Sequence, residues 1–335
     1  MSSDYIRQRV DALRHNSEDI HSQAEGIFNN FDTWTALKLI LHSAAVNMYT
    51  TVHAGQGTGD TFYIDALAGS GVSKYDSDRW FVGSPIVAAR AAKKPFTKMY
   101  LIESNDEYCN ALHDRLNYAF SIPGYTEPDE LEIIEGDVND EIMSVVDDIE
   151  NTGNFNDRFN YYCFVDNQGL DVEWPSIEHL TPRPYGDLLI NLPTAHGIGR
   201  NYDTEAAARF YGISSQELSS GQPTRADLHR RYCDQLRERG REVQTSTQVQ
   251  TDIGSFYYDL VYATRETGGD NGYMDVIQYV KEFIESVHSG DVGRILDVLD
   301  TDQTPLGQFL PDESIEDELP DEDEDDDQRG LNEFR

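Results

Sequence analysis

Thr61-Phe-Tyr-Ile-Asp-Ala-Leu-Ala-Gly-Ser-Gly71 is the stretch of the chain that decides its fold. Its apolar beginning, which ends at Asp65, predicts a buried strand, and the small residues Ala68 to Gly71 predict a tight turn after it. A buried strand followed by a glycine turn is how an open α/β sheet begins a nucleotide site. Gly69 and Gly71 would supply positive φ angles and let a ligand approach the backbone. The alternative is an ordinary strand and turn that bind no ligand.

A second apolar strand, Met99-Tyr-Leu-Ile-Glu103, ends in a carboxylate. An acidic residue at the tip of the second strand is placed to accept hydrogen bonds from ribose hydroxyls. Gly71 and Glu103 are farther apart than the interval of about 20 residues in the dinucleotide fingerprint, and the third glycine of that fingerprint is missing. These differences disfavour NAD and favour another adenosine ligand. A function in phosphate chemistry is disfavoured because the sequence has no Gly-x-x-x-x-Gly-Lys-Ser/Thr loop.

The remaining apolar runs extend the predicted sheet. We expect further strands at residues 131–137, 161–166 and 187–191, and an antiparallel pair at 242–251 and 256–263. Helical patterns occur at residues 34–48, 83–92, 106–120, 140–150, 174–180 and 273–288, and residues 72–81 are expected to form a polar loop. Ser84 is the expected N-cap of the second of these helices. Alternating strands and helices predict an α/β fold with a mostly parallel sheet.

Polar residues follow the predicted strands at the edge where ligands bind in such sheets. Asp137, after the third strand, would lie on the same edge as Asp65 and Glu103. It is expected to hydrogen-bond an adenine amino group, to cap the helix that follows, or to do both. Four residues after the fourth and fifth strands are expected to face the reacting centre: Asp166, Asn167, Gln168 and Asn191.

The chain is strongly acidic. Its 335 residues include 62 acidic and 26 basic side chains, which give a formal charge of -36. Such a surface repels itself at low ionic strength. The simplest explanation is adaptation to a salt-rich cytoplasm, because the Debye length falls to about 3 Å at 1 M salt. The charge disfavours a nucleic-acid partner, although molar salt weakens that argument and leaves such a partner open.

The cysteines and the apolar runs indicate where in the cell the protein is located. The three cysteines form no Cys-x-x-Cys pair and lie beside no histidine cluster, so we expect buried thiols in a reducing cytoplasm and no metal site: Cys109, Cys163 and Cys233. No run approaches the roughly 18 apolar residues of a membrane helix. The N-terminus has no basic, apolar signal pattern. We therefore expect a cytoplasmic protein without a membrane partner.

The pattern predicts three parts. Residues 1–56 form a helical cap, residues 57–290 form the sheet domain with a helical insertion at 197–240, and residues 291–335 form a C-terminal extension. Of the 16 residues from 312 to 327, 12 are acidic and none is basic, so we expect a solvated tail there.

Two groups of basic residues are open to a functional or a merely solvated interpretation. Lys38 lies on the helix that precedes the first strand, and the solvated interpretation is favoured for it. An arginine cluster in the insertion is likewise interpreted as a solvated helix face, with a binding patch as the alternative. The cluster comprises Arg230, Arg231, Arg237, Arg239 and Arg241.

Taken together, these motifs resemble the three-Cys-motif partner proteins (TcmP) over roughly residues 31–285. The motifs are a helix with Trp34 and Lys38, then residues 63–71, 83–85, 101–103, 136–139, 164–166, 187–191 and 262–265. That family looks like class I S-adenosylmethionine methyltransferases with a seven-stranded, Rossmann-like sheet. Its name comes from genomic association with a separate Cys-motif protein that resembles radical SAM enzymes, so such a protein is the implied partner.

The resemblance implies S-adenosylmethionine as the cofactor. It assigns Asp65, Ala68, Gly69 and Gly71 to the cofactor loop, Glu103 to the ribose and Asp137 to the adenine. Residues 166–169 occupy the place of the catalytic fourth-strand motif. There the chain has Asp-Asn-Gln-Gly, whereas the family generally has Asp-Pro-x-Gly and amino-group methyltransferases have Asp/Asn-Pro-Pro-aromatic. This departure disfavours methylation of adenine or cytosine amino groups.

Two functions follow as alternatives. In a methyltransferase, Asp166 would orient or deprotonate the nucleophile, and Asn167, Gln168 and Asn191 would position it. In the second, the chain is a non-catalytic cofactor-binding or scaffold partner of the Cys-motif protein, and Asp166 only caps its loop. The methyl acceptor is left open among RNA, DNA, protein and small molecules.

Overall fold

The structure is a computed structural model that describes residues 3–30, 33–56, 59–75, 79–152, 160–181, 186–193, 203–220, 223–250, 257–265 and 272–287. The predicted C-terminal extension from residue 291, with its acidic run, lies outside these residues. Among the residues described, no helix combines the length and apolar character needed to cross a membrane.

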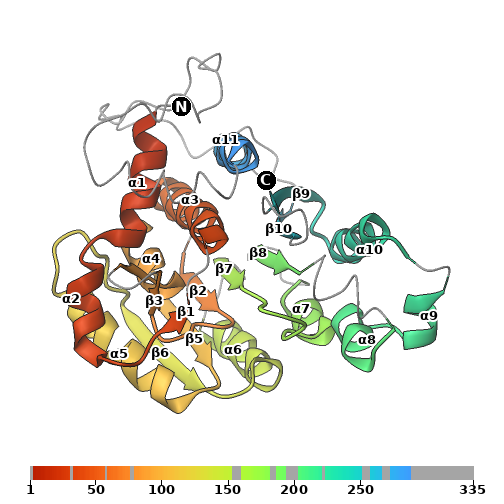
Figure 1. Ribbon diagram of the computed structural model, residues 1–335, viewed down its shortest axis with the longest axis horizontal. Helices are drawn as coiled ribbons and strands as arrows, with labels where there is room; N and C mark the ends of the chain where they lie inside the picture. The colour runs from red at the N-terminus through yellow and green to blue at the C-terminus, as the bar shows by residue number, and fades with distance from the viewer. Residues whose placement is uncertain are drawn as a thin grey trace.

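A seven-stranded sheet forms the centre of the molecule (Figure 1). Its strands are β2 (Thr61–Asp65), β5 (Lys98–Glu103), β6 (Glu130–Glu135), β7 (Asn160–Val165), β8 (Gly186–Leu192), β9 (Val243–Gln250) and β10 (Tyr257–Thr264). They lie in the order β6-β5-β2-β7-β8-β10-β9. The strands β6, β5, β2, β7 and β8 are parallel to one another, and β10 runs antiparallel to both β8 and β9. The predicted Rossmann-like fold, with a mostly parallel seven-stranded sheet and a terminal antiparallel pair, is confirmed.

Helices cover both faces of this sheet because the side chains of its parallel strands alternate between two apolar cores. One core contains Tyr63 and Phe164, and the other contains Ile64 and Val165. The first core is covered by α1 (Ser3–Arg14), α3 (Thr33–Gln56), α4 (Ser84–Ala91), α5 (Asp106–Phe120) and α11 (Tyr273–Ser286). The second is covered by α6 (Val138–Thr152), α7 (Trp174–Leu180), α8 (Glu205–Tyr211) and α10 (Arg225–Glu238). Figure 1 shows α3 and α11 on one side of the strands and α7 and α8 on the other.

Local sequence explains where several helices begin. The Asn105 side chain accepts hydrogen bonds from the amides of Glu107 and Tyr108, which caps α5. Ser84 is not the N-cap that the sequence predicts. It is the first residue of α4, and Gly83 takes the cap position in an extended conformation. Pro85 lies in the first turn, where its missing N–H leaves no helical hydrogen bond unmade.

A second, small sheet replaces the polar loop predicted at residues 72–81. There β3 (Val72–Lys74) pairs antiparallel with β4 (Trp80–Val82), and β1 (Asn29–Asn30) runs parallel to β3. The loop prediction was wrong because three apolar side chains at the two ends of this stretch are buried: Val72, Phe81 and Val82. The hairpin returns the chain to its start, where the Gly83 amide donates to the Gly71 carbonyl at 2.7 Å.

Two short helical segments connect α1 to the small sheet, and a third lies in the predicted insertion. They are α2 (Ser17–His21), η1 (Ser22–Ala24) and α9 (Ser215–Ser219). With α8 and α10, α9 makes the described part of residues 197–240 mainly helical. Leu218 of α9 is buried in the same core as α8 and α10.

Candidate functional site

The glycine turn after β2 has the backbone that the sequence predicts. Gly69 and Gly71 have φ angles of 64° and 83°, in the left-handed region that disfavours other residues. A Cβ on Gly71 would lie 2.8 Å from Leu112 Cδ1, so the turn also packs closely on α5. The buried Ala68 donates its amide to the Ile102 carbonyl at 2.9 Å and ties the turn to β5.

Glu103, at the end of β5, faces this turn. Its Oε2 accepts the Gly69 amide at 2.9 Å, and its Oε1 accepts the Asn105 amide at 2.9 Å. The side chain is only half-buried. The Ser104 hydroxyl also donates to Oε1, at the long distance of 3.5 Å. A carboxylate offers about four lone-pair directions, so these bonds leave acceptor capacity for a ligand hydroxyl.

Asp137, at the end of β6, lies on the same edge of the sheet but is exposed. Its Oδ1 accepts the Asn139 amide at 2.8 Å, and its carbonyl accepts the amides of Asp140 and Glu141. Asp137 therefore caps α6, which is one of its two predicted roles. Its contact with an adenine stays a prediction.

Asp65 is fully buried beneath the glycine turn. Its Oδ2 accepts the Tyr63 hydroxyl at 2.8 Å, and its Oδ1 accepts the Leu67 amide at 3.3 Å. No cation forms an ion pair with it among the residues described. Burial raises the pKa of Asp65 to about 7, and the negative charge of Asp166 acts in the same direction while the hydrogen bonds oppose it. The carboxylate would be stabilised by a positively charged ligand group.

His42, on α3, is a buried residue near Asp65 that was not predicted from the sequence. Its Nε2 is 3.2 Å from the Ser84 carbonyl and its Nδ1 is 3.0 Å from the Tyr162 hydroxyl. Because a carbonyl only accepts, Nε2 carries the proton and Nδ1 accepts from Tyr162. Burial lowers the pKa of His42 to about 3, so the ring is neutral at pH 7. Its position one helical turn after Lys38 was the available signal.

Lys38 pairs with Asp166, at the end of β7. Its Nζ lies 2.7 Å from Oδ1 and 2.6 Å from Oδ2, and both side chains are largely buried. The favoured interpretation of Lys38 as a solvated residue was therefore wrong. The reason is that α3 is covered on most sides, so Lys38 extends toward the end of the sheet, where a carboxylate balances its charge.

Asn167 and Asn191 lock the loop after β7 to β8. Asn167 Nδ2 donates to the Asn191 carbonyl at 3.0 Å, and Asn191 Nδ2 donates to the Asn167 carbonyl at 2.9 Å. Asn191 Nδ2 also donates to Asp166 Oδ1 at 3.0 Å. Both of its acceptors lack hydrogens, which fixes the orientation of the Asn191 amide. Among the described residues its Oδ1 then has no hydrogen-bond partner, although Asn191 is only 6% exposed.

The structure thus brings together three of the four predicted reacting-centre residues, Asp166, Asn167 and Asn191. The fourth, Gln168, has an exposed side chain. Its amide and that of Gly169 donate to Asp171 Oδ2, each at 2.8 Å, which shapes the turn. Gln168 therefore does not join the cluster of Asp166, Asn167 and Asn191 through its side chain.

Two further residues that sequence reasoning missed hold the glycine turn from the N-terminal side. The guanidinium of Arg115, fully buried on α5, donates to the carbonyls of Ser70 and Ala24 at 2.7 and 2.8 Å. Burial lowers the pKa of Arg115 to about 10, so it stays charged at pH 7. Asn29 Oδ1 accepts the Ser70 amide and hydroxyl, each at 2.9 Å. No local motif announces these contacts, because the partners lie far apart in the sequence.

The arginine cluster of the insertion divides into two parts. Arg230, Arg231, Arg237 and Arg239 are half-exposed or exposed and pair with nearby carboxylates, as predicted for a solvated face. Arg241 is 1% exposed and donates to the Tyr161 hydroxyl at 3.3 Å, so its assignment to that face was wrong. Its position after the end of α10 turns it inward.

The cysteines carry no reactive chemistry. All three are free; Cys163 and Cys233 are buried as predicted, and Cys109 is half-buried. Burial raises the pKa of each thiol, so none is a thiolate at neutral pH. No three histidine, cysteine, aspartate or glutamate side chains of the described ranges are grouped as metal ligands would be.

Comparison with known proteins finds distant structural similarity alone. No family model and no curated protein sequence matches the chain. A protein from Legionella pneumophila assigned to the family model DUF519 is 10% identical with a TM-score of 0.46, over 73% of this chain and 91% of its own. An O-methyltransferase from Bacillus cereus in complex with SAH is 13% identical with a TM-score of 0.34, over 76% and 100%. Magnesium protoporphyrin IX methyltransferase from Synechocystis with bound SAH is 12% identical with a TM-score of 0.35, over 76% and 97%. Likeness at this level identifies no activity.

Proposed function

We propose that this chain is an S-adenosylmethionine-dependent methyltransferase. The observation that carries the proposal is the pairing of the glycine turn with Glu103 at the carboxyl edge of the parallel strands. Gly69 and Gly71 give the turn its positive φ angles, and the half-buried Glu103 retains acceptor capacity beside it. An adenosine ligand at this edge of the sheet would contact the turn and place its ribose hydroxyls on the carboxylate.

The charges of the site favour this cofactor over a dinucleotide. Asp65, Glu103 and Asp137 place three carboxyl groups around one edge. A pyrophosphate would be repelled there, whereas S-adenosylmethionine brings an ammonium and a sulfonium. The buried Asp65, which has hydroxyl and amide donors as partners, would be stabilised by such a cation.

The cluster at the ends of β7 and β8 supports binding of the methyl acceptor. S-adenosylmethionine supplies an activated methyl group, so the protein's main task is to align the nucleophile with it. Lys38 contacts both oxygens of Asp166, which favours an orienting role for this carboxylate over proton removal. Asn191 Oδ1 has no hydrogen-bond partner in the described part of the chain, so it could accept a hydrogen bond from an O–H or N–H group of the methyl acceptor.

The second candidate is a non-catalytic, cofactor-binding or scaffold partner of a three-Cys-motif protein. It is favoured by the missing prolines of the fourth-strand motif and by the exposed Gln168. Under either function we propose membership of the TcmP family, a Cys-motif protein as partner, and a salt-adapted surface suited to the cytoplasm. The cap, sheet domain and extension predicted from the sequence belong to the same proposal.

The test is calorimetric titration of S-adenosylmethionine and S-adenosylhomocysteine in molar KCl. We expect micromolar binding to the wild type and roughly tenfold or greater loss in Glu103→Ala, because a charge-assisted hydrogen bond is removed. Glu238→Ala, an exposed glutamate on α10, is the matched control and should bind as the wild type does.

Absence of binding to well-folded wild type would overturn the proposed function. Binding without release of S-adenosylhomocysteine, in the presence of the Cys-motif protein and of candidate RNA, protein and small-molecule acceptors, would favour the scaffold.

A further inference from the structure

A cavity of about 550 Å³ lies away from the candidate site. It is lined by residues of α1 and α3, by the end of α4 and by residues 124–126. The end of α4 and residues 124–126 come shortly before β5 and β6, so this cavity is at the amino-terminal edge of the parallel strands. The cofactor turn follows β2 at the opposite edge.

The charge of this cavity is the reverse of the charge of the chain. Its lining contains four basic residues, Arg7, Arg9, Arg90 and Lys93, and one carboxylate, Asp11. In the whole sequence, acidic residues outnumber basic ones by 62 to 26. A cationic hollow in so acidic a protein is not the product of average composition.

Arg9 is the buried centre of this charge. It is 5% exposed, yet no carboxylate pairs with it among the residues that the structure describes. Its Nη1 and Nη2 donate to the Ser43 carbonyl and Gln8 Oε1, each at the long distance of 3.4 Å, and its Cζ lies 4.8 Å from the centre of the Tyr5 ring. Its Nε has no hydrogen-bond partner among the described residues. A buried guanidinium with such weak partners is stabilised when an anion binds beside it.

The other basic residues hold fixed or accessible positions around Arg9. Arg90 donates to the Gly124 carbonyl at 2.9 Å and approaches Asp11 at 3.4 Å, so its guanidinium is held at the wall. Arg7 and Lys93 are exposed, and no described carboxylate pairs with either. The cavity therefore combines two positioned guanidiniums with two cations that are open to solvent.

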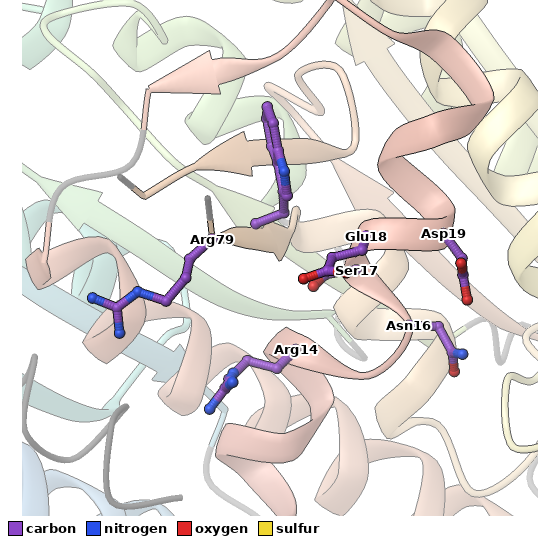
Figure 2. Close-up of a pocket in the computed structure, with 7 residues that line it drawn as sticks. Arg14, Asn16, Ser17, Glu18, Asp19 and Arg79 are labelled. Carbon is purple, nitrogen blue, oxygen red and sulfur yellow. The ribbon is translucent and has the colours of Figure 1, made fainter. Parts of the chain in front are cut away.

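A second cavity beside α1 provides a comparison. It has a volume of about 250 Å³ and lies where α1 meets α2 and β4. Figure 2 shows Arg14 and Arg79 on one side of it and Asp19 on the other, with Glu18 between them. Two cations and two carboxylates balance there, so the cationic excess belongs to the larger cavity.

We propose that the larger cavity binds a phosphate-bearing small molecule. Its volume falls within the roughly 300–1,000 Å³ of small-molecule sites. Arginine forks match the oxygens of a phosphate, and two of them converge here with Lys93. A small ligand is favoured over nucleic acid because the site is concave and the net charge of -36 repels a long polyanion. The site is independent of the proposed methyltransferase function.

The test is calorimetric titration of inorganic phosphate, pyrophosphate and ADP into the full-length protein at constant KCl concentration. We expect saturable binding of at least pyrophosphate or ADP. Binding should fall about tenfold or more in the double variant Arg7→Gln/Lys93→Gln, because two charge-assisted contacts are lost. Both residues are exposed, so the variant keeps the buried Arg9 and the fold.

Arg14→Gln, on the same helix but in the balanced cavity, is the matched control and should bind as the wild type does. S-adenosylmethionine binding by each variant reports on folding and on the other site. The proposal is overturned if none of the three anions binds saturably, if the double variant binds like the wild type, or if only a single-stranded oligonucleotide binds.

Discussion

The two halves of the carboxyl edge of the sheet hold their polar side chains in different ways. At the ends of β5 and β6, the accessible carboxylates of Glu103 and Asp137 accept hydrogen bonds from backbone amides close by. At the ends of β7 and β8, Asp166 and Asn191 are held by other side chains and are shielded from water. The first half is built by loop geometry, and the second by packing of α3 against the sheet.

Because of this difference, substitutions in the first half should affect mainly ligand binding, and substitutions in the second half should also affect stability. A change in the first half alters what a ligand meets and leaves the core intact, because few buried groups depend on it. A change in the second half leaves a buried charge or amide unpartnered, so it lowers the free energy of unfolding as well as activity. We expect the largest effects in the second half and at the buried end of β2, and the smallest effect in the first half.

Lys38→Met should produce the largest loss of stability. It leaves the Asp166 carboxylate buried and unpaired, and breaking such a pair costs about 3–5 kcal/mol. Urea unfolding of the full-length protein measures it. The double variant Lys38→Met/Asp166→Asn should recover at least half of the loss, because no buried charge then lacks a partner.

The control for this prediction is Lys281→Met, which removes a more exposed pair with Glu285 at 3.6 Å. Its loss should stay below about 1 kcal/mol. If Lys38→Met were no more destabilised than Lys281→Met, the two halves would not differ in the way described.

Gly71→Ala should be next in size. Alanine would be strained at φ 83°, and its Cβ would lie 2.8 Å from Leu112 Cδ1, so we expect a loss of about 2–4 kcal/mol from strain and overpacking together. Gly240→Ala is the matched control, because its φ is 85° and its Cβ would meet nothing closer than 4.0 Å. Urea unfolding of both variants separates packing from strain. Equal losses would show that α5 does not press on the turn.

The edge formed by the ends of β2, β5 and β6, where we propose the cofactor site, could be predicted from sequence because its parts are local. Asp65, Gly69 and Gly71 lie within seven residues, and a strand followed by a tight turn determines their arrangement. The parallel order of the sheet then brings Glu103 and Asp137 to the same edge. Composition and periodicity carry this information directly.

The partners of Asp166 and of the glycine turn could not be predicted in the same way. Lys38 is separated from Asp166 by 128 residues and Arg115 from Ser70 by 45, so no local pattern links them. A lysine is solvated in most proteins, and only the burial of α3 reverses that expectation. The strands β3 and β4 were missed because each has only three residues.

Asp65 should make both stability and cofactor affinity depend on pH. Its pKa is about 7 in the folded state and 3.8 ordinarily, so the folded state holds the proton more tightly. The stability that this proton confers is full below pH 3.8 and is lost as the pH rises through 7. In urea unfolding, Asp65→Asn should therefore gain stability relative to the wild type between pH 5 and pH 7.5, by less than about 4 kcal/mol.

Affinity should change with pH in the opposite sense. A cationic cofactor binds the ionised carboxylate, so affinity for S-adenosylmethionine should rise between pH 6 and pH 7.5, by roughly tenfold at most. The ligand's own amino group titrates near pH 7.7–8.0, so the pH dependence is measured by calorimetry in both the wild type and Asp65→Asn, and the difference between them reports on Asp65. An affinity in the wild type that is as independent of pH as in Asp65→Asn would remove Asp65 from the cofactor site.

Asp137 should give the smallest effect, and two substitutions distinguish its two roles. Asp137→Ser keeps an N-cap oxygen for α6 but shortens the side chain, so stability should change by less than about 0.5 kcal/mol. If Asp137 also contacts adenine, affinity for S-adenosylmethionine should fall about fivefold in this variant. Asp137→Ala should add a stability loss of about 1 kcal/mol through the missing cap. Full affinity in Asp137→Ser would show that Asp137 only caps α6. The proposed cofactor site would then depend on Glu103 and the glycine turn without Asp137.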